Sequence, residues 1–182
     1  MKVKKEKLRS SIASLKKKYS LEDLEKMSEE VLSVLEITGD FRSSKNIFIY
    51  NSLNDEVATR NFVRRWRHEK NFYLPVVKED RLVFVLCSDN LEYCLSPLGI
   101  NEPVGKEITD YSKVDMIIVP GVAFDRKMNR LGRGKGYYDR FLPMLKAKRV
   151  GVCFDFQLLG SIPSDSNDVK MDMIVSENEL IW

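Results

Sequence analysis

The segment MIIVPGVAFDRKMNRLGRGKGYYDRFL, residues 116–142, contains the pattern on which the fold prediction depends. Its first four residues are all apolar and stop at Pro120 and Gly121, which is typical of a strand buried on both faces of a parallel sheet. A polar, glycine-rich loop follows, and the residues after it predict a helix over 137–148. Apolar runs at 149–154 and 171–175 predict two further strands. Strands and helices therefore alternate, as in an α/β protein.

The residues before this segment predict the other elements. Apolar residues at helical spacing predict a helix over 5–19, and Ser20 with Asp23 at the capping-box position predicts the start of a second helix. Strands are predicted at 46–50, 72–77 and 82–86, the last two as a hairpin, with a helix over 56–70 between the first and the second. The predicted fold is a three-layer α/β/α single domain, residues 1–182, with a mostly parallel central sheet.

Composition excludes several classes of protein. The chain has 182 residues, of which 43% are hydrophobic and 31% charged, as in an ordinary globular domain. No apolar run is long enough for a membrane span or a secretory signal. Cys87, Cys94 and Cys153 form no C-x-x-C pair, which favours free thiols in a reducing compartment. We therefore expect a cytoplasmic protein, and a net charge of +3 does not by itself imply nucleic-acid binding.

The glycine-rich loop has the composition of an anion site. Gly132, Gly134 and Gly136 alternate with Arg133 and Lys135. Glycine allows positive φ and close backbone approach, so that N–H groups can converge on phosphate oxygens, and a helix start adds partial positive charge. The two cations supply full charges, so the loop predicts binding of a nucleotide triphosphate.

Two residues flank this loop. Arg130 precedes it with a further positive charge, and Asp139 lies one turn into the predicted helix, where a carboxylate suits a Mg²⁺ that bridges phosphates. A Gly-rich stretch before a helix can also be only a flexible turn with solvated charges. Three glycines interleaved with two cations are more than such a turn needs.

The loop matches neither of two common nucleotide fingerprints. No Ser or Thr follows Lys135, so it is not a P-loop, and its G-x-G-x-G spacing differs from the G-x-G-x-x-G of dinucleotide folds. Asp155 nevertheless imitates the ribose-binding acid of those folds, at the end of a predicted strand. A dinucleotide-binding oxidoreductase therefore stays an alternative.

The same segment resembles the signature of the 5-formyltetrahydrofolate cyclo-ligase family, P-G-x-x-F-D followed by R-L-G-x-G-x-G-Y-Y-D. Further matches follow in order along nearly the whole chain. They are KEKLR at 5–9, Tyr50 with Asp55 and Glu56, LPV at 74–76, GINEP at 99–103, Gln157, and Asn167 with Asp168.

The resemblance implies an ATP- and Mg²⁺-dependent ring closure of 5-formyltetrahydrofolate to 5,10-methenyltetrahydrofolate, with ADP and phosphate released. A formyl carbon bound to nitrogen is a poor electrophile, so phosphorylation of its oxygen creates the leaving group, and the neighbouring folate nitrogen then attacks. Positioning and charge stabilisation carry such chemistry without a protein nucleophile. A small folate and ATP are the expected partners of a monomer, without nucleic acid or membrane.

The resemblance also assigns site residues by position. Those expected to bind ATP are Lys5, Arg9, Arg130, Leu131, Gly132, Arg133, Gly134, Lys135, Gly136, Tyr137 and Tyr138. Those expected to contact the folate are Asn51, Glu56, Arg133, Gly134, Lys135, Gly136 and Tyr137, and those expected to act on the reacting groups are Arg133, Lys135 and Tyr137. Asp139 and Asp168 are expected to hold Mg²⁺.

Some residues allow a second interpretation. Glu56 suits the donor-rich edge of a pterin, but an acid near a helix start is also favoured by the helix dipole. Tyr137 can contact the substrate or simply pack. Met128 stands where the family often has glycine, and Asn167 where it often has histidine; neither change removes an expected ligand, so we expect activity. A noncatalytic relative that binds folate or RNA is the remaining alternative.

Overall fold

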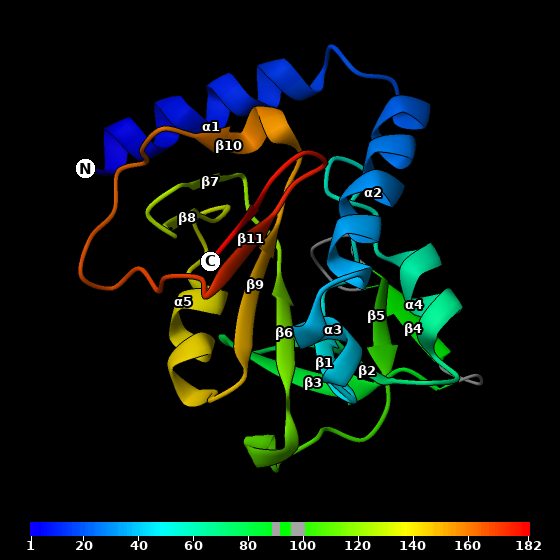
Figure 1. Ribbon diagram of the computed structural model, residues 1–182. Helices are drawn as coiled ribbons and strands as arrows, with labels where there is room; N and C mark the ends of the chain where they lie inside the picture. Colours follow the sequence, from blue (N-terminus) through cyan, green and yellow to red (C-terminus); the bar gives the residue numbers. More distant parts are fainter. Residues whose placement is uncertain (89–91, 96–100) are drawn as a thin grey trace.

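A seven-stranded sheet forms the centre of the protein (Figure 1). The computed structural model describes residues 1–88, 92–95 and 101–182. The strand order is β12-β11-β9-β6-β1-β2-β3, with parallel pairs from β11 to β2 and an antiparallel strand at each edge. The strands are β1 (Asn46–Ile49), β2 (Asn71–Lys78), β3 (Arg81–Leu86), β6 (Met116–Val119), β9 (Lys148–Val152), β11 (Met173–Val175) and β12 (Leu180–Ile181). The predicted mostly parallel sheet and its hairpin are confirmed.

Helices cover both faces of this sheet. Figure 1 shows α2, α3 and α4 on one side and α5 on the other. Successive residues of β1 alternate between two cores, since Ile47 and Ile49 pack with the first group of helices and Phe48 packs with α5. All four residues of β6 are buried, as its sequence predicts. The helices are α1 (Lys2–Lys16), α2 (Leu21–Glu36), α3 (Gly39–Ser43), α4 (Arg60–Trp66) and α5 (Tyr137–Phe141), with 3-10 turns η1 (Tyr111–Lys113), η2 (Leu142–Met144) and η3 (Asp155–Gln157).

Two short sheets lie outside the main one. They are β4 (Glu92–Leu95) with β5 (Asn101–Val104), and β10 (Leu158–Leu159) with β7 (Ala123–Asp125) and β8 (Arg130–Leu131). The second sheet packs against α1, where Ile12 of the helix contacts a cluster that includes Val122 and Leu131. Figure 1 shows α1 lying across β10 and β7. The first helix is thereby held beside the residues that follow β6.

Two helices are shorter than their sequences predict. Ser20 caps α2 with the expected capping box, but α4 begins at Arg60 rather than at residue 56. In a helix that began at residue 56, the Thr59 N–H would donate to the Asp55 carbonyl. Here it donates to the Ser52 hydroxyl at 3.2 Å, and the Asp55 carbonyl accepts from Lys16. Helix α5 ends at Phe141 and gives way to η2, because Pro143 has no N–H for a continuing α-helix.

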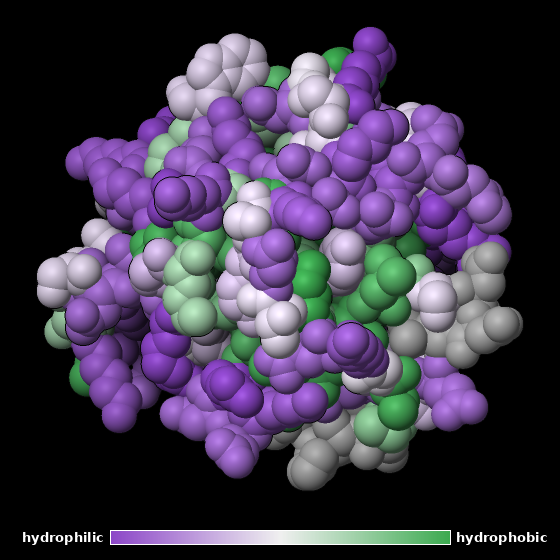
Figure 2. Space-filling view, turned by 90° about the horizontal axis from the view of Figure 1, so that it is seen from below, coloured by the Kyte–Doolittle hydropathy of each residue, from purple (hydrophilic) through white to green (hydrophobic). Residues whose placement is uncertain are grey.

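The face of the protein seen in Figure 2 is mainly polar. Figure 2 shows a face on which hydrophilic side chains surround a band of hydrophobic atoms. Among the described residues, no helix combines the length and the apolar composition that crossing a membrane requires. All three cysteines are free thiols, as predicted.

Two glycines allow the small sheet to approach the main one. A Cβ atom added at Gly121 or at Gly151 would lie 2.5 or 2.4 Å from ring carbons of Phe124. The Gly151→Ala substitution should therefore lower the free energy of unfolding by about 1–3 kcal/mol, since an extra methyl must displace a buried ring. Denaturant unfolding measures this. A Cβ at Gly160 would meet nothing within 4 Å, so Gly160→Ala is the control; equal stability of both variants would contradict the packing argument.

Candidate active site

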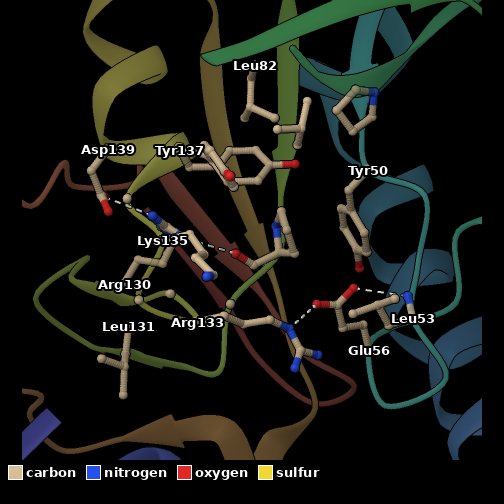
Figure 3. A pocket seen from close by; sticks show the side chains of 18 of the residues that line it. Tyr50, Leu53, Glu56, Leu82, Arg130, Leu131, Arg133, Lys135, Tyr137 and Asp139 are labelled. Carbon is tan, nitrogen blue, oxygen red and sulfur yellow. Dashed lines mark hydrogen bonds and ion pairs between the residues drawn. The ribbon is translucent and has the colours of Figure 1, made fainter. Parts of the chain in front are cut away.

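The main cavity lies where the strand order of the sheet reverses. From β1 the chain first adds β2 on one side, and later β6 and β9 on the other. Ligands of open α/β sheets bind at the carboxyl ends of strands beside such a switch point. Here the residues directly after β1 and β6, Tyr50, Asn51, Pro120 and Gly121, line a cavity of about 480 Å³. Figure 3 shows this cavity from close by.

The structure brings every residue of the predicted site to this one cavity. They come from α1, from the segment after β1, from the glycine loop with α5, and from the segment before β11. They are Lys5, Arg9, Asn51, Glu56, Arg130, Leu131, Gly132, Arg133, Gly134, Lys135, Gly136, Tyr137, Tyr138, Asp139 and Asp168.

Sequence reasoning did not assign the apolar wall of the cavity. Pro75, Val77 and Leu82 of the β2–β3 hairpin line it together with Tyr50. Pro75 and Tyr50 belong to segments that match the family but were given no role, and Val77 and Leu82 resemble core residues of any strand. The resemblance to the family included Glu102 but did not assign it a role. Its carboxylate is buried, lines the cavity and accepts a hydrogen bond from the Val77 backbone at 3.3 Å. Of the matched segment 99–103, residues 99 and 100 lie outside the described residues.

The glycine loop bends as its composition predicts. Gly134 and Gly136 have φ angles of 101° and 71°, where other residues are strained. From α1, the Arg9 guanidinium donates to the Gly132 carbonyl at 2.9 Å and holds the start of the loop. The α5 helix that follows has only five residues, so it adds less dipole charge than the predicted longer helix would.

Arg133 is held across the mouth of the cavity by two carboxylates. Its Nε donates to Glu56 at 3.0 Å (Figure 3), and its Nη2 donates to Asp55 at 2.5 Å. The buried Lys16 ammonium also contacts Asp55. Burial disfavours the charged form of Arg133, but the carboxylates of Glu56 and Asp55 outweigh it and raise the pKa of the guanidinium. Arg133 therefore stays charged without a ligand.

Glu56 lies outside helix α4. It precedes the helix by four residues, so the helix-dipole interpretation does not apply to it. Its second oxygen accepts from the Leu53 backbone N–H at 3.1 Å, which fixes the turn after β1. The side chain of Glu56 is 9% exposed, against 45% for its partner Arg133. The carboxylate thus has a fixed place in the wall of the cavity.

Arg130 lies beneath the loop as a buried cation. Its guanidinium donates to Asp139 at 2.8 Å and to the Pro120 carbonyl at 3.2 Å, and lies 5.5 Å from the centre of the Tyr138 ring. Burial, with the nearby Glu56 carboxylate, raises the pKa of the Tyr138 phenol well above its ordinary value, so the hydroxyl keeps its proton. Arg130 thereby fixes Asp139 and the end of β6 together.

Lys5 joins α1 to the segment that carries Asp168. Its ammonium lies 2.6 Å from Asp168 and 2.9 Å from Asp165. Burial lowers the pKa of Lys5, but the hydrogen bonds to these two carboxylates outweigh it and leave the pKa raised. Lys5 and Asp168 line the cavity, whereas Asp165 does not.

Asp139 and Asp168 fit a Mg²⁺ that also binds phosphates. The described residues contain no group of three or more acidic, His or Cys side chains that would hold a metal alone. Mg²⁺ in nucleotide enzymes is bound by one or two carboxylates, phosphates and waters, and so needs no such group. Within the described residues, Oδ1 of Asp139 accepts a hydrogen bond from Arg130, and Oδ2 of Asp168 accepts from Lys5 and from the Asp165 N–H. The other oxygen of each carboxylate is left for a metal.

Comparison with known proteins identifies the family. The model of the 5-formyltetrahydrofolate cyclo-ligase family matches residues 1–177. The chain belongs to this family. A 5-formyltetrahydrofolate cyclo-ligase of Haemophilus influenzae is 33% identical over 144 residues, 74% of this chain and 77% of that protein. A probable 5-formyltetrahydrofolate cyclo-ligase of Schizosaccharomyces pombe is 29% identical over 201 residues, which cover 100% of this chain and 98% of that protein.

A solved structure agrees with this membership. The 5,10-methenyltetrahydrofolate synthetase of Aquifex aeolicus superposes with a TM-score of 0.87 at 34% identity, over 97% of this chain and 91% of that one. The dinucleotide alternative loses its support, because Asp155 is not among the residues that line the cavity of this cyclo-ligase family member. Its backbone N–H instead donates to Glu177 at 2.7 Å, and its carboxylate accepts from Asn178.

Other residues at which this chain was compared with the cyclo-ligase family have structural roles. The buried Gln157 amide donates to the carbonyls of Gly121 and Val122, at 3.1 and 2.9 Å, and so supports the segment after β6. Met128 has a φ of 67°, which explains why glycine suits this position in the family. Asn167 lies outside the cavity in a turn, where its N–H donates to Asp165 at 3.1 Å.

Glu177 predicts a pH dependence of stability. Burial raises its carboxyl pKa from 4.5 to about 7, and the Asp155 carboxylate adds to the shift. A raised acid pKa stabilises the fold fully below pH 4.5, and this stabilisation is lost as the pH rises through about 7. The loss should reach up to about 3 kcal/mol. Denaturant unfolding of wild type and Glu177→Gln between pH 4.5 and 8 measures it.

The glutamine variant keeps an oxygen that can accept from the Asp155 N–H and does not titrate. Its free energy of unfolding should therefore fall less over this pH range than that of the wild type. Glu25→Gln, on the exposed face of α2, is the control and should follow the wild type. Parallel curves for wild type and Glu177→Gln would show that the Glu177 carboxyl does not titrate in this window.

Proposed function

We propose that this protein uses ATP to close 5-formyltetrahydrofolate to 5,10-methenyltetrahydrofolate, with release of ADP and phosphate. The observation that carries this proposal is one cavity that combines an apolar wall, a buried carboxylate and a glycine loop with several cations. The names of the relatives and their coverage of the chain support the folate substrate. ATP, Mg²⁺ and the role of each residue are part of the proposal.

The two ends of the cavity suit the two substrates. Pro75, Val77 and Leu82 offer a flat apolar surface to a pterin ring, and the fixed Glu56 carboxylate can accept hydrogen bonds from its donor-rich edge. Gly134 and Gly136 open the backbone of the loop, where phosphate oxygens can approach its N–H groups. Arg133 spans the two ends, since it leaves the loop and reaches Glu56.

Charge stabilisation is the main task of the protein in this reaction. The formyl oxygen attacks the γ-phosphorus of ATP and ADP leaves. The neighbouring folate nitrogen then attacks the activated carbon, loses its proton to the solvent, and the C–O bond breaks so that phosphate departs. Arg133 and Lys135 balance the negative charge of the transferring group in this proposal, which is supported by their position, with Tyr137, in the lining of the cavity. Lys5, Arg9 and Arg130 hold the nucleotide side in place. Mg²⁺, held by Asp139 and Asp168, would neutralise further phosphate charge.

A direct assay tests this function. Purified protein mixed with 5-formyltetrahydrofolate, ATP and Mg²⁺ should form the methenyl product, which is followed by its absorbance. Absence of an ATP-dependent product would contradict the proposal. Tight, salt-sensitive RNA binding without turnover would instead favour the noncatalytic alternative.

The proposal includes a monomer in the reducing cytoplasm. The cytoplasm suits three free thiols, and gel filtration tests the monomer.

A further inference from the structure

A second cavity opens beside the first. It also has a volume of about 480 Å³, and it is formed by α4, β2 and β4 rather than by the glycine loop. Asn51 lines both cavities. A long ligand whose ring occupies the first cavity can therefore extend past Asn51 into the second.

Arginines of α4 give the second cavity a positive charge. Arg60, Arg64 and Arg67 line it and follow one another at i, i+4 and i+7, so they lie on one face of the helix. Among the described residues that line this cavity, none is acidic. Arg60 and Arg64 form no ion pair within residues 1–88, 92–95 and 101–182, and Arg64 donates only to the neutral Asn61.

Arg65, on the opposite face of the same helix, shows the contrast. Its guanidinium lies 3.0 Å from Glu29 and 2.7 Å from Glu36, on α2. The fold therefore supplies carboxylate partners to the arginine that packs against α2. Arg60 and Arg64 have no carboxylate partner among the described residues and can meet an external anion.

The floor of this cavity is apolar. Val63 and Leu74 line it and are 8% and 5% exposed as whole residues, and Tyr93 contributes an aromatic ring. An apolar floor with an arginine rim matches a ligand that has an aromatic spacer and ends in carboxylates. Guanidinium groups bind carboxylates through two parallel hydrogen bonds.

We propose that the second cavity binds the aminobenzoyl-glutamyl end of the folate substrate, with Arg60 and Arg64 as the carboxylate ligands. This inference rests on the proposed function, since it extends the same substrate beyond the pterin. Phosphates of the nucleotide are the other anions that these arginines could meet. They differ in a testable way, because a nucleotide site would change the response to ATP and not the response to the glutamyl group.

Binding of two ligands to the wild-type protein is the first test. Calorimetry compares 5-formyltetrahydrofolate with the primary amide of 5-formyltetrahydropteroate, which lacks the glutamyl group and carries no carboxylate, and needs no turnover. Loss of charge-assisted hydrogen bonds should weaken binding of the shorter ligand by about 10–100-fold. Equal dissociation constants would overturn the inference. Discrimination between the ligands without any methenyl product would overturn the proposed activity and leave this site intact.

Variants on the two faces of α4 provide the second test. The double variant Arg60→Gln with Arg64→Gln should bind both ligands equally, with an unchanged KM for ATP. Arg65→Gln removes the same kind of charge from the other face and should keep the wild-type preference. Equal weakening of both ligands in the double variant, or a raised KM for ATP with the ligand preference intact, would contradict the assignment.

Discussion

Replacing Lys135 with alanine should lower kcat/KM for the cyclisation by about 10²–10³-fold, because one charge that stabilises the transferring phosphoryl group is lost. Stability should hardly change. The Lys135 side chain is exposed, and within the part of the chain that the structure describes it forms no ion pair. The free energy of unfolding should therefore stay within about 0.5 kcal/mol of the wild type. Initial rates and denaturant unfolding measure the two effects.

Lys127→Ala is the matched control. Lys127 is also an exposed lysine of the segment between β6 and α5, but it does not line the cavity. Its removal should leave both rate and stability unchanged. Equal losses of stability and activity in Lys135→Ala would mean that the loop lysine is structural.

The central sheet could be predicted because its strands are locally distinct. Met116–Val119 is wholly apolar, and Ser20 with Asp23 carries its own capping signal. The strands β7, β8 and β10 have only two or three residues each, and β10 pairs with a strand more than thirty residues earlier. Nothing local marks such short pairings, since their partners are fixed by the packing of α1 and of Phe124.

The loop residues of the site were predicted because glycines that alternate with cations are unusual in a simple turn. Their partners were not. No sequence pattern shows that Arg133 pairs with Glu56, Arg130 with Asp139, and Lys5 with Asp168. These pairs join segments that are distant along the chain, except for Arg130 and Asp139. They hold the cations in position without a ligand, which would reduce the reorganisation that the proposed phosphate binding requires.

Asp168, a ligand of the proposed Mg²⁺, can be compared with the neighbouring Asp165. Both carboxylates accept a hydrogen bond from Lys5, but only Asp168 lines the cavity. The Asp168→Asn substitution should raise the Mg²⁺ concentration for half-maximal activity at least about tenfold, because a neutral amide is a weaker ligand for a hard cation. A Mg²⁺ titration of initial rates at saturating ATP measures this.

Asp165→Asn breaks the other contact of Lys5 and should leave the Mg²⁺ titration unchanged. Some stability should be lost in both variants, since each removes a partner of a half-buried ammonium. The difference between the variants therefore reports on the metal and not on Lys5. If both titrations shift equally, Asp168 acts only through Lys5 and α1, and Asp139 is left as the one carboxylate of the proposed metal site.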